Sequence, residues 1–400
     1  MRHGGTIKMV GEMSTALGHP TLDTLMADLP GLAEEASSRA PEAERLRRLP
    51  QDFAERLLRA GAMRVLVPTD LGGLGGTFLD WWTVAFALAK ADASAGWVTG
   101  QCGMYCGLLA AKHPASVTRQ IFAEPMANVT GSGNGKGVAV RVNGGFRVTG
   151  RWKFASGCTL ATYLSGHPDL DGQPGPIALA AFAPASEVTI HEDWDVVGML
   201  GTGSHEIEFR DVFVPTEFSN SPFDGYTTTS GPYAALASGH WWDSCAAAAV
   251  QLGIARRLLD EVWSSARSTP LSPLLPGSRA RTTDSAVLRV LQWCEGILYA
   301  QESAMERAIG WFWDRAGEGP VMVRQRLTIS TAAVTAVHEA KRVIDLVFEI
   351  GGAAALRNDA VLSRLVRDAQ AMPVHAAARK SRFELIGRVA EGDEALAAFI

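Results

Sequence analysis

The stretch VGMLGTGSHEIEFRDVFVP, residues 197–215, joins a glycine-rich turn to an alternating pattern of apolar and polar residues. Alternation with a period of two is typical of a β-strand with one buried face. Three further runs between residues 129 and 200 also look like strands: GVAVRVNGGFRVTGRWKFASG, IALAAFAPA and EVTIHEDWDVVG. In the first, Asn143–Gly144 lies between two alternating segments and predicts a hairpin. We therefore expect a middle β domain, a barrel or sandwich, over residues 129–230.

Helical patterns occupy the chain on both sides of these strands. Residues 22–128 carry apolar side chains at three- and four-residue spacing, and residues 231–400 hold four apolar-faced segments that predict a four-helix bundle. Residues 1–21 lack the apolar core of a signal peptide and look like a loose leader. Helices, strands and helices in series argue against alternating βαβ units. The expected fold class is therefore α+β, with three domains in series.

The composition argues against several classes of function. Of the 400 residues 47% are hydrophobic, and the net charge of −5 gives no reason to expect a nucleic-acid partner. No stretch of about 18 apolar residues occurs, so we expect no membrane span. The five cysteines form no CxxC pair and the nine histidines are dispersed, which indicates a cytoplasmic protein without a metal site.

The glycine-rich run GSGNGKG, residues 131–137, invites comparison with phosphate-binding loops. Its spacing matches neither GxxxxGKS/T nor GxGxxG, because Lys136 stands where the last glycine of the second pattern would be. We expect a flexible loop that enters the β domain instead.

Several stretches, taken in order, resemble the acyl-CoA dehydrogenase superfamily. They are LLRAGAMRVLVPTDLGGLGG (57–76), ALAKADASAGWV (87–98), the opening stretch 197–215, FEIGGAAAL (348–356) and LSRLVRDA (362–369). The resemblance covers roughly residues 22–400. It implies an N-terminal helical domain, a middle β domain and a C-terminal bundle, with a flavin held between the β domain and the bundle.

Within this superfamily, RWKFASGC (151–158) is similar to the two-component, group D flavin monooxygenases, which receive reduced flavin from a separate reductase. Phe154 and Ser156 stand where ordinary dehydrogenases have a tryptophan and a threonine. An aromatic ring offers the flavin a flat apolar neighbour, and a hydroxyl reaches its polar edge. The resemblance implies flavin contacts from Trp152, Phe154, Ala155, Ser156, Gly201, Thr202, Ser204, Gly351 and Gly352.

The segment VRDAQAMPVHAAARK, residues 366–380, bears on the reaction class. Aligned with the family's Arg-Asp motif, Ala376 falls where common dehydrogenases carry the glutamate that removes a proton, and alanine cannot accept one. His375 beside it is what the resemblance to the flavin monooxygenases implies. There it steadies the flavin C4a-hydroperoxide or moves its proton, because neutral imidazole both donates and accepts.

Two further residues are catalytic candidates. Tyr105 occupies the place of a second histidine in many aromatic hydroxylases of the group, and Asp243 the place where a few acyl-CoA dehydrogenases carry their base. Asp243 leaves open an acyl-CoA dehydrogenase-like oxidase or dehydrogenase, and amine N-oxygenation is a further alternative. His240 would also shape the substrate pocket.

The leading expectation is a monooxygenase that uses reduced FAD or FMN and O₂ to oxygenate a small aromatic or polyketide-like substrate. Its partners would be that substrate, O₂ and a flavin reductase, which delivers the flavin either in a complex or only by diffusion of the flavin. The family also implies a homotetramer.

Overall fold

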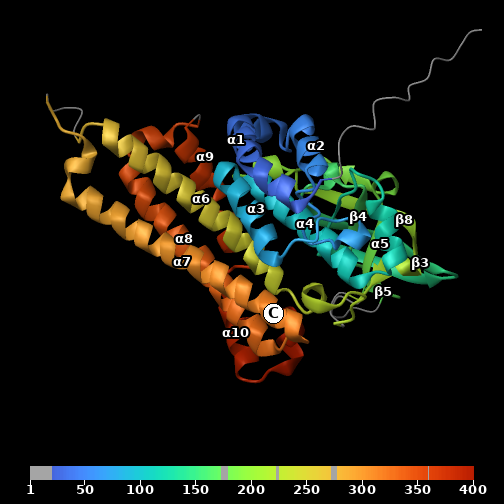
Figure 1. Cartoon of the computed structure of the whole chain (residues 1–400). Coiled ribbons are helices and arrows are strands. Elements are labelled where there is room, and N and C mark those ends of the chain that lie inside the picture. The colour runs from blue at the N-terminus through green and yellow to red at the C-terminus, as the bar shows by residue number, and fades with distance from the viewer. Residues whose placement is uncertain (1–19, 173–178, 222–224, 272–276, 359) are drawn as a thin grey trace, which may run out of the picture.

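The computed structural model describes residues 20–172, 179–221, 225–271, 277–358 and 360–400, so most of the expected leader lies outside the described residues. Figure 1 shows the N-terminal helices between the strands on one side and the long helices of the bundle on the other. The order of helices, strands and helices agrees with the fold class expected from the sequence. No helix in the described ranges has the length and apolarity that a membrane crossing requires.

The N-terminal part consists of five helices: α1 (Leu22–Leu46), α2 (Gln51–Arg59), α3 (Phe78–Ala91), α4 (Ala93–Lys112) and α5 (Ala115–Phe122). Asp92 separates α3 from α4, and its carboxylate caps α4 by accepting the Ala95 N–H at 2.9 Å. Nearly all of α4 is buried, because it packs against α3, α6 and β1. This helix therefore connects all three parts of the chain.

The strands form two sheets. The larger has the order β5-β2-β3-β8-β7 and the smaller β1-β4-β6-β9. The strands are β1 (Val129–Ser132), β2 (Asn134–Val142), β3 (Gly145–Ala155), β4 (Tyr163–Gly166), β5 (Asp169–Leu170), β6 (Ala180–Pro184), β7 (Thr189–His191), β8 (His205–Pro215) and β9 (Ser219–Asn220). Side chains from both sheets share one core around Trp152 and Phe209. Gly144 has φ 79° in the β2–β3 turn, as the Asn-Gly hairpin signal predicts.

The expectation of a flexible loop at residues 131–137 is wrong. All of these residues except Gly133, a bend between the two strands, belong to β1 or β2, and Gly137 pairs with Gly150 on β3. A Cβ atom added to Gly137 would lie 2.6 Å from the Trp152 ring, so this glycine makes room for the buried indole. The run is rich in glycine because a large side chain packs across the strands.

The C-terminal part contains three long helices, α6 (Trp241–Ser268), α7 (Ser285–Glu318) and α8 (Val323–Gly351). The fourth expected helical segment is divided into α9 (Val361–Asp368), a 3₁₀ turn (Met372–Val374) that contains Pro373, and α10 (Ser381–Ala390). Proline lacks the N–H that would continue a helix, so α9 and α10 are separated by a segment of turns. His375 lies in this segment, directly after the 3₁₀ turn.

Candidate active site

A cavity of about 880 Å³ lies where the strands, α4, the start of α6 and the segment after α9 meet. Small-molecule sites usually measure about 300–1,000 Å³. The cavity brings together seven of the residues singled out in the sequence: Tyr105, Phe154, Ser156, Thr202, Ser204, Asp243 and His375. It also contains His240 and Ala376.

Phe154 forms an aromatic wall of the cavity. Its backbone has φ 65°, and a register shift interrupts the pairing of β3 with β8 between Trp152 and Ala155. A bulky residue in this left-handed conformation costs of the order of 1–3 kcal/mol and persists only where the surroundings fix it. Phe154 is 52% exposed. The centroid of its ring lies 5.8 Å from that of the Trp194 ring, and the two ring planes are at 90°. Two aromatic side chains thus border the same space.

A chain of hydroxyl groups lies beside these rings. Ser204 Oγ is 2.7 Å from both Ser156 Oγ and Thr202 Oγ1. At its two ends, Trp97 Nε1 donates to Ser156 Oγ at 2.9 Å, and Thr202 Oγ1 donates to the Met199 carbonyl at 2.8 Å.

The two ends fix the direction of the hydrogen bonds. Since the single proton of Thr202 is used on Met199, Ser204 donates to Thr202 and Ser156 donates to Ser204. The three hydroxyls can therefore offer a ligand only lone pairs.

His375 follows the 3₁₀ turn that contains Pro373, and its backbone N–H bonds back to the Ala371 carbonyl at 3.1 Å. Its Nδ1 lies 3.2 Å from the Ala377 N–H and accepts that hydrogen bond. The neutral ring must then carry its proton on Nε2. The ring meets Trp97 edge-on at a centroid distance of 5.1 Å, so the imidazole and the hydroxyl chain share one supporting side chain.

A polar group of residues lines the cavity near the start of α6. Gln101 Nε2 donates to Asp243 Oδ1 at 3.0 Å. Burial, and then the nearby Asp243 carboxylate, raise the pKa of Tyr105 well above its usual range, so this hydroxyl stays protonated. Burial also lowers the pKa of His240 to about 4, which keeps its ring neutral near pH 7.

The chain matches the acyl-CoA dehydrogenase N-terminal domain over residues 31–128 and the C-terminal domain over residues 245–380. It is 30% identical over 375 residues to the oxygenase subunit HsaA of a flavin-dependent monooxygenase from Rhodococcus jostii, an alignment that covers 89% of this chain and 94% of that protein. The chain belongs to this family of flavin-dependent monooxygenases. The reaction class expected from residues 151–158 and 366–380 is thereby confirmed, and the chain is an oxidoreductase.

Two further relatives show what the family contains. The oxygenase component of an FADH₂-dependent resorcinol hydroxylase from Rhizobium is 34% identical over 196 residues, which cover 48% of this chain and 47% of that protein. The structure of XiaF from Streptomyces, in complex with FADH2 and glycerol, superimposes with a TM-score of 0.81 at 25% identity and covers 93% of this chain and 94% of that one.

Five of the residues named as flavin contacts lie outside the cavity of this monooxygenase. Trp152 and Ala155 are buried in the β core, and a Cβ on Gly201 would touch Ala43 and Ser94. Gly351 and Gly352 lie at the end of α8, near α9. Trp152 lies on the core-facing side of β3 with Phe146 and Val148, and the register shift between Trp152 and Ala155 brings Ala155, three positions further, to the same core. No contact of these five residues with the cavity follows from the structure.

Other cavity residues were not predicted from the sequence. Four of them, Trp97, Gln101, Leu108 and Lys112, share one face of α4 with Tyr105. Their spacing of three or four residues was the available signal, but it also fits ordinary core packing. His167 and Trp194 come from irregular segments between the strands, and no pattern in the sequence indicated that they line a site.

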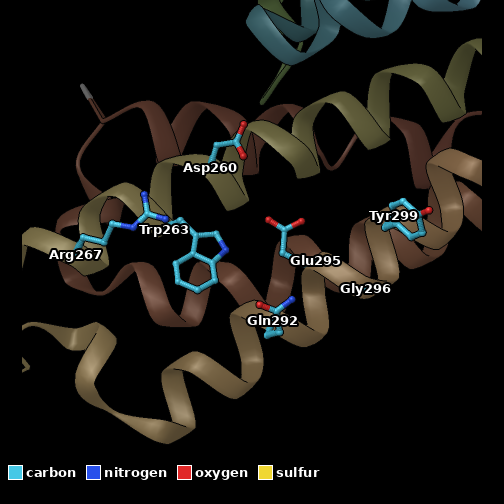
Figure 2. A pocket seen from close by; sticks show the side chains of 7 residues that line it. All are labelled: Asp260, Trp263, Arg267, Gln292, Glu295, Gly296 and Tyr299. Atoms are coloured by element: carbon cyan, nitrogen blue, oxygen red, sulfur yellow. The ribbon is translucent and has the colours of Figure 1, made fainter.

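A second hollow lies on the bundle, between α6 and α7 (Figure 2). It is bordered by Asp260, Trp263, Arg267, Gln292, Glu295, Gly296 and Tyr299. None of these residues was a candidate for catalysis or flavin binding. Around it, α7 exposes Trp293 (50%) and Tyr299 (73%).

Proposed function

We propose that this monooxygenase takes reduced FMN or FAD from a separate reductase and transfers one oxygen atom of O₂ to a small aromatic or polyketide-like substrate. The other oxygen atom leaves as water, and the flavin leaves oxidised. The observation that supports this proposal is a single cavity in which Phe154, the Ser156–Ser204–Thr202 hydroxyls and His375 surround one space, with Ala376 where a dehydrogenase has its base. The reduced flavin, when bound, would supply the two electrons that activate O₂, and O₂ would supply the transferred atom.

Phe154 and Trp194 would border the flavin ring, and the hydroxyl chain would meet its polar edge. These residues fit the cofactor, because the reduced ring carries N–H donors and the three hydroxyls have only lone pairs to offer. The apolar side chains around the cavity, among them Leu108, Phe182 and Met372, would keep water from the reacting atoms.

His375 would hold or move a proton at Nε2, since Nδ1 is already occupied by the Ala377 N–H. The Trp97 edge fixes the plane of the ring. Tyr105 and Asp243 would contact the substrate, Tyr105 as a donor and Asp243 as an acceptor.

The partners beyond the substrate and O₂ would be a flavin reductase and further copies of the chain. Exposed Trp293 and Tyr299 on α7 support association through the bundle into a homotetramer, because large exposed apolar side chains commonly mark interfaces. All five cysteines are free and buried, which supports a reducing, cytoplasmic location.

The test is a single-turnover reaction. The purified protein would be mixed anaerobically with photoreduced FMN or FAD and an aromatic substrate panel, and then with ¹⁸O₂. We expect one ¹⁸O atom in the product without any reductase present. Oxidised flavin and peroxide with no labelled product, across the panel and with both flavins, would refute the proposal.

A further inference from the structure

We propose that Ser244 and Gln251 on α6, together with His338 on α8, are positioning residues for His375. The inference rests on the proposed function, in which His375 holds or moves a proton at Nε2. None of the three is among the described residues that line the cavity. Each acts instead through the backbone of residues 369–378, the segment that carries His375.

The first of these contacts replaces a hydrogen bond that proline removes. In a helix, the carbonyl of one residue accepts from the N–H four positions further on, so the Ala369 carbonyl would accept from residue 373. Residue 373 is proline and has no N–H. Gln251 Nε2 donates to the Ala369 carbonyl at 3.1 Å instead. Gln251 thus supplies the hydrogen bond that Pro373 cannot make.

Gln251 makes this contact at a cost to the core of the bundle. The residue is fully buried, and its Oε1 atom makes no hydrogen bond with any described residue. A buried polar atom without a partner destabilises the folded state, and an apolar side chain of the same length would avoid this. The hydrogen bond from Nε2 to Ala369 is therefore the contribution that sets Gln251 apart from an apolar residue.

Ser244 holds the other end of the segment, directly behind the His375 ring. Its Oγ donates to the Ala377 carbonyl at 2.7 Å, and both residues are buried. The N–H of the same alanine donates to His375 Nδ1 at 3.2 Å. Ser244 thus fixes the residue whose N–H occupies Nδ1, and the occupied Nδ1 leaves the ring proton on Nε2.

His338 fixes the next residue of the segment. Its Nε2 lies 2.9 Å from the Ala378 carbonyl, and a carbonyl oxygen only accepts, so this nitrogen is the donor. Residues 376–378 are all alanine, and their methyl groups make no hydrogen bonds. The conformation beside His375 consequently depends on donors from α6 and α8.

The test measures coupled turnover by the full-length protein in the single-turnover reaction with ¹⁸O₂. Ser244→Ala should form about tenfold less labelled product per reduced flavin, because a displaced acid or base is no longer aligned with the reacting atoms. The affinity for reduced flavin should stay at the wild-type value. Ser330→Ala is the matched control and should leave the product yield unchanged. Ser330 is a fully buried serine of α8 whose hydroxyl bonds to no described residue.

A double-mutant cycle separates positioning from a general structural effect. In the His375→Ala background, Ser244→Ala should cause no further loss of product, because the group that it positions is gone. A purely structural effect would lower the yield by the same factor in both backgrounds. Such additivity, or a wild-type product yield in Ser244→Ala, would overturn the inference.

Gln251 provides a second test, which stands even if Ser244→Ala fails to fold. Gln251→Met keeps the length of the side chain but cannot donate, so it should lower both the melting temperature and the product yield. Adding Pro373→Ala returns an N–H to residue 373 and should recover part of the lost melting temperature. If Pro373→Ala shifts the melting temperature equally with and without Gln251, the role assigned to Gln251 is wrong.

The His375→Ala variant distinguishes failure of this inference from failure of the proposed function. If His375→Ala keeps coupled turnover, the proposed role of His375 fails, and the positioning role fails with it. If His375→Ala uncouples the reaction but Ser244→Ala and Gln251→Met do not, the function stands and the positioning role fails. His191→Ala is the control for loss of a histidine. His191 lies on β7, bonded to Glu208 away from the cavity.

Discussion

Phe154 combines a left-handed backbone with a ring exposed to the cavity. Comparing Phe154→Gly with Phe154→Ala separates the two properties, since glycine accepts this backbone without strain and alanine does not. We expect both variants to bind reduced flavin about tenfold more weakly, because both lose the ring. We also expect Phe154→Gly to be more stable than Phe154→Ala by about 1 kcal/mol. Anaerobic flavin titration and thermal unfolding provide the measurements; wild-type flavin affinity in Phe154→Gly would contradict the role of the ring.

His375 offers Nε2 to the cavity because its other nitrogen is occupied. His375→Ala should uncouple flavin oxidation from oxygenation and lower the product formed per reduced flavin by about 100-fold, the usual scale for loss of a positioned acid or base. Product and peroxide would be quantified in the same single turnover. His191→Ala is the control, and coupled turnover by His375→Ala would rule out this role.

At the scale of elements, Asp368 joins α9 to the turn that presents Thr202 and Ser204. Its Oδ1 accepts the Met199 N–H at 2.5 Å, and Met199 has φ 59°. The Met199 carbonyl in turn accepts from Trp194 Nε1 at 3.1 Å and from Thr202. One buried carboxyl group from the bundle thus holds a turn of the β domain that borders the cavity.

Because Asp368 is buried, we predict that the stability of the protein depends on pH. Burial, followed by the charge of Asp92, raises the pKa of Asp368 to about 7 in the folded protein, whereas the unfolded value is about 4. The folded state therefore holds a proton that the unfolded chain has released. The cost to stability is absent below about pH 4, grows as the pH rises towards about 7, and is complete above that.

Asp368→Asn should remove this cost and keep an oxygen acceptor for the Met199 N–H. We expect the variant to exceed the wild type in stability by about 2 kcal/mol at pH 8, and by less at pH 5. Asp368→Ala, which lacks the acceptor, should be less stable than Asp368→Asn at both values. Chemical denaturation at the two pH values checks this, and parallel wild-type and Asn curves would disprove it.

At the scale of the whole molecule, the proposed homotetramer can be tested at Trp293 on the exposed face of α7. Trp293 is 50% exposed, and its ring lies 4.8 Å from the Arg342 guanidinium. Trp293→Glu should reduce the molar mass measured by light scattering below that of the tetramer, because a charge would be buried at an apolar contact. Val140→Glu on β2, a position of similar exposure (51%), is the control and should leave the mass unchanged. A monomeric wild type would refute the proposed assembly.

Much of this molecule follows from local sequence. The strand pattern around residues 205–215, the Asn143–Gly144 hairpin and the break at Pro373 are set by neighbouring residues, and the structure contains each of them. The loss of the base at Ala376 is also visible in one short segment. The expectation for residues 131–137 failed because strand pairing with β3 and the Trp152 ring, which lie elsewhere in the chain, decide the structure there.

The sequence by itself thus determined the order of the three parts, the family and the reaction class. Only the tertiary structure decided which side chains share the cavity, since Gln101 meets Asp243 across 142 positions and Met199 meets Asp368 across 169. The tertiary structure also decided which nitrogen of His375 is free, it raises the pKa of Asp368, and it places His167 at the cavity. These properties depend on burial and on distances between segments far apart in the chain, and residue type and local spacing do not specify them.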